Sequence, residues 1–171
     1  MGHPKAEVVV DGRRLLDRAV AALRGGGCDP VIAVVRTGTS AASAIPVVNP
    51  DPERGMRSSL QLAVDAAAGC DALAVVLVDM PGIGADAIRT VVAGWQPGRI
   101  ALAQYPGGRR GHPTVMAPAL WTEAIARAAP DEGARVLLNA RPDLVDAIEV
   151  AGDVSDLDSP EDLARWSGGR G

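Results

Sequence analysis

The chain has 171 residues, a formal net charge of -4 and 2% aromatic residues. This length suits one domain over residues 1–171, and the mixed-sign charges exclude a basic nucleic-acid-binding surface. No apolar run approaches the roughly 18 residues that a membrane span needs, and no leader-like segment opens the chain, so we expect a cytoplasmic protein without membrane contact. Cys28 and Cys70 lack metal-binding spacing and are expected to be reduced thiols.

Val- and Ile-rich runs alternate with helical patterns along the chain. Such alternation predicts an α/β fold with a mainly parallel sheet, and continuously apolar runs are typical of strands buried on both faces. The residues between 106 and 111 are predicted to form a loop. The expected helices lie near 15–23, 56–68, 85–93, 118–129 and 133–139 with a last one capped by Ser159, and the strands near 31–35, 72–78, 100–104, 114–116 and 144–150.

Asp79 follows directly after the apolar run that ends at Val78. Ligands of open α/β sheets bind beyond the carboxyl ends of the strands, so this carboxylate is a candidate site residue. Aspartate at a strand end also commonly forms a turn or caps a helix. Position alone leaves both interpretations open.

The segment 49–60 joins a strand to a helix through a loop that ends in Gly55, Ser58 and Ser59. Backbone amides and hydroxyls at a helix start can hold a phosphate or a sugar hydroxyl. Helix capping alone would explain the two serines equally well.

Three further places carry charge or an imidazole. Lys5 could act as a point charge on a phosphate or could simply be solvated. His112, in the basic segment 109–113, could belong to an anion clamp or to an exposed turn. Asp156 and Asp158 precede the last helix and could stabilise its start, or could approach Asp79 and form an oxygen-ligand site for Mg²⁺.

Taken together, eight segments resemble the molybdenum cofactor cytidylyltransferase branch of the MobA-like nucleotidyltransferases. The resemblance covers essentially the whole chain and depends on their common order. The segments are Met1-Gly-His-Pro-Lys5, Asp11-Gly12 with Leu15-Leu16, Val48-Asn49-Pro50, Gly55-Met-Arg-Ser-Ser-Leu60, Asp79-Met-Pro81, Arg110-Gly-His-Pro113, Asp131-Glu-Gly-Ala-Arg135 and Asp156-Leu-Asp-Ser-Pro-Glu-Asp-Leu163.

The resemblance implies a three-layer Rossmann-like sandwich of the nucleotide-diphospho-sugar transferase type. Such an enzyme transfers a nucleotide from an NTP to a phosphorylated acceptor and releases pyrophosphate. In this branch the donor is CTP, the acceptor is the molybdopterin cofactor and Mg²⁺ assists. A molybdoenzyme is a possible partner.

The resemblance also assigns roles residue by residue. Lys5 is expected to neutralise the phosphates of the donor, and Asp79 to bind Mg²⁺ together with Asp158, with Asp156 in reserve. The residues expected along the nucleotide are Asn49, Gly55, Ser58 and Ser59, and those expected to face the acceptor are His112 and Arg135.

The family pattern begins with an apolar strand and a glycine-rich loop that this sequence lacks. Losing about five buried aliphatic side chains forfeits on the order of 10 kcal/mol, which is comparable to the whole stability of a typical domain. We therefore expect the natural start to lie upstream of Met1.

Two other functions stay open. Some relatives of this branch are described as oxidoreductases acting on nicotine-derived pigments, although the glycines of 107–111 lack the spacing of a dinucleotide-binding motif. A non-catalytic relative could instead serve as a binding module for a molybdoenzyme.

Overall fold

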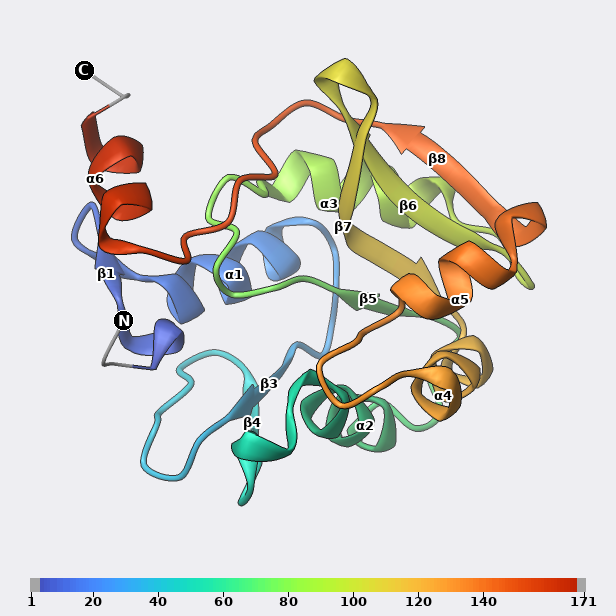
Figure 1. The fold of residues 1–171 in the computed structure, drawn as a ribbon, viewed down its shortest axis with the longest axis horizontal. Helices are drawn as coiled ribbons and strands as arrows, with labels where there is room; N and C mark the ends of the chain where they lie inside the picture. Colours follow the sequence, from blue (N-terminus) through green and yellow to red (C-terminus); the bar gives the residue numbers. More distant parts are fainter. Residues whose placement is uncertain (1–3, 169–171) are drawn as a thin grey trace.

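A computed structural model describes residues 4–168, so residues 1–3 of the first matching segment lie outside the described part (Figure 1). The strands are β1 (Val9–Val10), β2 (Arg13–Arg14), β3 (Ile32–Val35), β4 (Ile45–Val48), β5 (Leu73–Val75), β6 (Ile100–Tyr105), β7 (Arg109–Met116) and β8 (Val145–Glu149). The α-helices are α1 (Leu15–Gly25), α2 (Met56–Ala66), α3 (Ala85–Gly94), α4 (Pro118–Arg127), α5 (Arg135–Ala140) and α6 (Pro160–Gly168). The 3₁₀ helices are η1 (Lys5–Glu7), η2 (Pro52–Arg54), η3 (Pro106–Gly108) and η4 (Pro142–Leu144).

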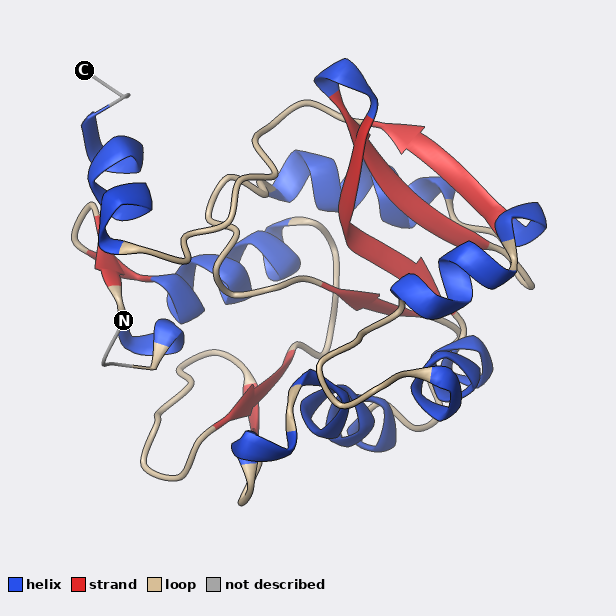
Figure 2. Ribbon diagram, in the orientation of Figure 1, coloured by secondary structure: helices blue, strands red, loops and turns tan. Residues whose placement is uncertain are grey.

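The strands pair in three separate groups, which Figure 2 shows in red. β1 and β2 form a short antiparallel pair, and β3 pairs with β4 in parallel. The largest group has the order β5-β7-β6-β8, in which β6 and β8 are parallel while β7 runs antiparallel to both of its neighbours. One strand of the largest group thus runs against the others.

Helices cover both faces of the largest sheet. Ile100 of β6 packs with α2, α4 and α5, whereas Ala101 and Ala103 of the same strand pack on the opposite side with Val91 of α3. This alternation follows from the two-residue period of a strand. The predicted three-layer α/β sandwich is confirmed.

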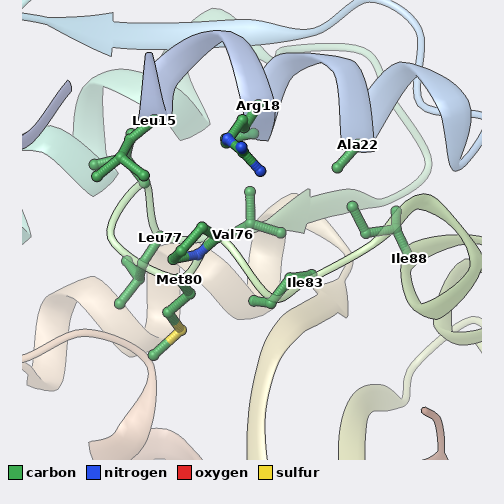
Figure 3. Close-up of a pocket in the computed structure, with 11 residues that line it drawn as sticks. Leu15, Arg18, Ala22, Val76, Leu77, Met80, Ile83 and Ile88 are labelled. Atoms are coloured by element: carbon green, nitrogen blue, oxygen red, sulfur yellow. The ribbon is translucent and has the colours of Figure 1, made fainter. Parts of the chain in front are cut away.

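The amino-terminal part is organised around α1. Leu16 and Val20 lie one helical turn apart and pack against β3. On the other side of α1, Val76, Met80 and Ile83 help to line a pocket of only about 10 Å³ (Figure 3). That volume is at the lower limit for one water molecule, so this side of α1 is well packed.

A much larger cavity, of about 800 Å³, separates β3 from β5. Its walls come from these two strands and from α1 and α2, and we call it the β3–β5 groove. Within residues 4–168, neither β3 nor β5 has a strand partner on the side of the groove.

Several boundaries differ from the sequence-based expectation. β5 ends at Val75 rather than at 78, because the following residues leave the ladder for the turn around Asp79. The expected loop 106–111 is wrong in its second half: β7 already begins at Arg109 and pairs with Tyr105. The hairpin of β1 and β2 was not predicted, since its strands contain only two residues each.

The start of α6 agrees with the sequence signal. The backbone amide of Asp162 donates to Ser159 Oγ, and the amide of Ser159 donates back to Asp162 Oδ2. This reciprocal pair is a capping box. No helix within residues 4–168 combines the length and the apolar character that a membrane crossing requires.

Candidate functional site

Lys5, Asp79 and Asp158 meet beyond the carboxyl end of β5. The Lys5 ammonium donates to Asp79 Oδ2 over 2.7 Å and also donates to Asp158 Oδ1. The structure therefore brings together three residues from the beginning, middle and end of the chain. Their roles in a reaction stay a prediction.

A backbone contact holds the segment that carries Asp158 beside the strand end. The amide of Leu157 donates to the carbonyl oxygen of Asp79 over 2.9 Å. The Leu157 side chain is buried with Val10, Leu15 and Trp166. Core packing on one residue thus positions the carboxylate on the next.

The hydrogen bonds between Lys5 and Asp158 favour the charged forms of both side chains. Burial acts to lower the pKa of Lys5, but hydrogen bonds from its ammonium to Asp158 and Asp79 outweigh burial and raise the pKa above its ordinary value. The hydrogen bond from Lys5 lowers the pKa of Asp158. Lys5 and Asp158 therefore stabilise the charged form of each other.

One atom of Asp79 stands out. Oδ1 is buried and has no hydrogen-bond partner among the described residues, while Oδ2 accepts from Lys5. A buried acceptor without a donor costs about 1–3 kcal/mol, so such an atom indicates a missing donor or cation. Within residues 4–168 no three metal-ligating side chains gather in one place, which leaves the carboxylates of Asp79 and Asp158 as the candidate protein ligands.

Arg14 supports the position of Lys5, and the sequence analysis did not single it out. Its guanidinium donates to Glu7 in η1, to Asp17 in α1 and to the Ser40 carbonyl. It thereby fastens the short helix η1, which carries Lys5, to α1. The three-residue spacing of Arg14 and Asp17 could have indicated their ion pair from the sequence, whereas the contact of Arg14 with Glu7 is seen only in the folded structure.

Asn49 organises the loop that leads to α2. The side chain is buried, and its amide nitrogen donates to Ser58 Oγ and Ser59 Oγ, both over 3.0 Å. Its amide oxygen accepts from the backbone of Asp51. The structure thus joins three of the residues expected along the nucleotide, and it shows that they also stabilise the loop itself.

Gly55 is required by a close approach of two loops. Its φ is +87°, and a Cβ built on it would lie 2.4 Å from the Pro130 carbonyl oxygen and 2.6 Å from Asp131 Oδ1. The same carbonyl accepts from the Arg57 amide over 3.0 Å. Gly55 therefore lets the start of α2 dock on the 130–131 turn.

His112 lies on β7 and contacts the end of β5. Its Nδ1 is 3.0 Å from the Val75 carbonyl oxygen, which can only accept, so Nδ1 carries the proton. Burial lowers the pKa of His112 more than the Val75 bond and the nearby Asp79 raise it. The ring is therefore neutral at pH 7, with Nε2 as its acceptor atom.

Arg135 and Asp156 stand apart from these contacts. Arg135 begins α5 and is exposed, and no described interaction joins it to Lys5 or Asp79. Asp156 is also exposed and lies two residues before Asp158 in the chain. Asp156 is therefore a neighbour of the carboxylate group, whereas Arg135 lies outside it.

The chain is similar to known proteins in sequence and in fold. A family model described as the MobA-like NTP transferase domain matches residues 1–145. Nicotine blue oxidoreductase from Paenarthrobacter nicotinovorans is 35% identical over 178 residues, covering 95% of this chain and 87% of that protein.

Two solved structures are similar in fold. One is Rv0371c from Mycobacterium tuberculosis H37Rv in a complex with manganese, with a TM-score of 0.81 and 22% sequence identity. The match covers 96% of this chain and 91% of the Rv0371c chain. The 2-C-methyl-D-erythritol 4-phosphate cytidylyltransferase from Thermus thermophilus has a TM-score of 0.72 at 21% identity, with coverage of 97% and 93%. Since the family model spans most of the residues, the chain belongs to the MobA-like NTP transferase family and is a nucleotidyltransferase.

Proposed function

We propose that the chain transfers CMP from CTP to a phosphorylated acceptor of the molybdopterin type and releases pyrophosphate. The observation that carries this proposal is the Lys5 ammonium held by Asp79 and Asp158, next to a buried Asp79 oxygen without a partner. The choice of CTP is supported by the motifs of the cytidylyltransferase branch and by a fold neighbour that is a cytidylyltransferase.

The reaction needs no protein nucleophile. A phosphate oxygen of the acceptor attacks the α-phosphorus of CTP in line, and the bond from the α-phosphorus to the oxygen bridging to the β-phosphate breaks. The bond electrons leave with pyrophosphate. Catalysis of this kind depends on positioning and on charge stabilisation, which Lys5 can supply to the triphosphate.

The carboxylates fit Mg²⁺. This ion takes oxygen ligands and commonly uses one or two carboxylates together with substrate phosphates and water. Asp79 and Asp158 would hold it, and the buried Asp79 Oδ1 is an oxygen that lacks a donor. When bound, Mg²⁺ withdraws charge from phosphate oxygens. Lys5 must then exchange at least one carboxylate for a phosphate of the donor.

The remaining residues divide between donor and acceptor. We assign Asn49, Gly55, Ser58 and Ser59 to the nucleotide side, because the buried amide of Asn49 fixes both hydroxyls at the start of α2. Replacing His112 by alanine should weaken acceptor use more than CTP binding. We assign Arg135 to an anionic part of the acceptor. Because Arg135 makes no described contact with Lys5 or Asp79, this role requires either that the acceptor extends to α5 or that α5 moves towards the acceptor.

The decisive experiment measures pyrophosphate release from each of the four NTPs with molybdopterin cofactor and Mg²⁺. Asp79→Asn removes one charge and keeps the shape, and we expect a loss of turnover of at least about 100-fold. Asp143→Asn is the matched control, because this exposed carboxylate pairs with Arg141 and should leave turnover unchanged. Wild-type turnover in Asp79→Asn would overturn the assignment.

A second candidate is oxidoreduction of a nicotine-derived pigment, which the 35% identity to nicotine blue oxidoreductase favours. Thermal shifts separate the two functions, because a ligand that binds the folded state raises Tm. CTP with Mg²⁺ should raise Tm if the chain is a transferase. A shift with a nicotinamide cofactor, and none with any NTP, would favour the oxidoreductase.

We place this reaction in the cytoplasm, where NTPs are available. A molybdoenzyme that receives the nucleotide-bearing cofactor is the partner this function implies. Co-purification of such an enzyme with the chain tests this partner.

A further inference from the structure

The short helix η1 directs its three side chains to three different places. A 3₁₀ helix has three residues per turn, so successive side chains are about 120° apart. Lys5 reaches the two carboxylates of the candidate site, and Glu7 reaches Arg14, the residue before α1. Ala6 packs against the apolar cluster of α1 and β3. The direction of Lys5 therefore depends on how the other two side chains are held.

The ion pair of Glu7 is the contact that can fix the rotation of η1 about its own axis. Apolar packing is not directional, so the methyl group of Ala6 sets no angle. The amide of Leu15 donates to the Val8 carbonyl over 2.9 Å and holds the end of η1 near α1, but a bond at one end leaves the helix free to rotate. Glu7 Oε2 lies off the axis and accepts from Arg14 Nη1 over 3.1 Å. The rotation of η1 therefore depends on Arg14.

Arg14 is itself held rigidly. Its Nε and Nη2 donate to the two carboxylate oxygens of Asp17, each over 2.8 Å, and Nη2 also donates to the Ser40 carbonyl over 3.1 Å. Two parallel hydrogen bonds to one carboxylate fix the plane of a guanidinium, which a lysine ammonium cannot reproduce. The Arg14 side chain is 22% exposed, whereas the side chains of the surface pair Arg36 and Glu53 are 53% and 79% exposed. Arg14 is thus a fixed point of the fold rather than a solvated surface charge.

We propose that Arg14 is a positioning residue: it holds Glu7, sets the rotation of η1 and so keeps the Lys5 ammonium against the two carboxylates of the candidate site. No hydrogen bond or ion pair within residues 4–168 joins Arg14 directly to the ammonium or to these carboxylates, so Arg14 acts through Glu7. Its effect on the position of Lys5 is independent of the reaction, whereas its effect on turnover rests on the proposed transferase function.

A zero-length crosslink measures the position of Lys5. The sequence contains no other lysine, so a crosslink from a lysine side chain is assigned without ambiguity. A carbodiimide activates a carboxylate, the Lys5 amine forms an amide bond to the carboxyl carbon, and the displaced oxygen leaves in a urea. Peptide mass spectrometry of the full chain gives the yields of the products that join Lys5 to Asp79 or to Asp158. We expect both products in the wild type, and in Arg14→Gln a summed yield that is lower by about fivefold or more.

Arg18→Gln is the matched control. Arg18 also lies on α1, its side chain is also 22% exposed, and it donates to the Val10 carbonyl and to Asp11 but not to η1. We therefore expect the wild-type yield in Arg18→Gln. An equal loss of yield in Arg18→Gln and Arg14→Gln, or a wild type without either product, would overturn the proposal.

Glu7→Ala removes the contact of η1 with Arg14 and keeps the contacts of Arg14 with α1. It should reproduce the low yield of Arg14→Gln, and it carries the test if Arg14→Gln lacks a native circular dichroism spectrum. The wild-type yield in Glu7→Ala would overturn the proposal.

A double-mutant cycle tests the effect of Arg14 on the reaction. Arg14→Gln should lower the rate of pyrophosphate release by about tenfold. Lys5→Met removes the group that Arg14 positions, so the double variant should be no slower than Lys5→Met alone. A merely structural role of Arg14 would lower the rate by the same factor in both backgrounds, and that result would overturn the positioning role.

The crosslinks and the rates separate this proposal from the transferase function. A wild type that releases no pyrophosphate from any of the four NTPs refutes the transferase function, and the crosslink yields then decide the role of Arg14 alone. Pyrophosphate release by the wild type, together with equal crosslink yields in wild type and Arg14→Gln, refutes the positioning role and leaves the transferase function standing.

Discussion

The β6–β8 region and the β3–β4 region differ in how completely they are packed. β6 has partners on both edges, and Ile100 and Ala101 have no exposed surface. Within the described residues β3 pairs only with β4, and Ile45 and Val48 of β4 are about half exposed. The candidate site lies between the two regions: Asp79 follows β5 at the edge of the four-stranded sheet, and Asn49 follows β4. The candidate site residues therefore lie outside the most densely packed strands.

A leucine-to-alanine substitution in each region should give the largest difference in the free energy of unfolding. Leu137 is fully buried among α2, α4 and the sheet, whereas Leu16 lines the β3–β5 groove. Leu137→Ala should cost about 4 kcal/mol, because it opens a new cavity, and Leu16→Ala about 2 kcal/mol, because it only enlarges an existing one. Urea unfolding measures both, and equal costs would mean that the groove is filled in solution.

Substitutions of two loop glycines should differ in their cost to stability. Gly55 and Gly38 both have a φ of +87°, but only Gly55 faces another loop at short distance. Gly55→Ala should cost about 3 kcal/mol or more, from strain and from displacement of the 130–131 turn, and Gly38→Ala about 1 kcal/mol from strain alone. Chemical denaturation at neutral pH gives both values. A cost for Gly38 that matches Gly55 would exclude the loop contact as the cause.

The smallest expected difference between the two regions is in the contribution of their ion pairs to Tm. Asp146 of β8 receives two hydrogen bonds from Arg99, whereas Arg36 and Glu53 form a single exposed contact. Asp146→Asn should lower Tm by about 2 °C, and Glu53→Gln by less than the error of the measurement.

The effect at Asp146 should depend on pH in one direction. The hydrogen bonds from Arg99 lower the pKa of Asp146, so the native state favours the charged form. Its stabilisation is complete above the ordinary pKa of 3.8 and disappears as the pH falls through the lowered value. The Tm difference between wild type and Asp146→Asn should therefore vanish in acid; a difference that grew in acid would contradict this sign.

Local signals in the sequence predicted most of the elements. The apolar stripe of α2, the glycines after α1 and the capping residues of α6 all operate within a few neighbours, and each of these elements lies where it was expected. Only the second half of β7 was predicted; its first half was missed, because Arg109 and Arg110 are exposed polar residues whose strand conformation comes from pairing with β6. Such pairing between distant segments leaves no local pattern.

The sequence identified the residues of the candidate site but not the contacts between them. Asp79 was identified from its place after a strand, and Asp158 from its place before a helix. That one ammonium joins both carboxylates depends on η1, which Arg14 fastens, and on Leu157, which is held by the core. Neither support follows from the spacing of residues.

The pairing of Lys5 with Asp158 also sets the order of events during synthesis. The two residues are separated by 153 positions, and the carboxylate is fixed only when Leu157 and Trp166 pack on Val10 and Leu15. A ribosome making this protein must therefore release the chain as far as residue 158 before the ammonium meets its second carboxylate. The four-stranded sheet needs the chain only as far as Glu149, so it can be completed before the charged site closes.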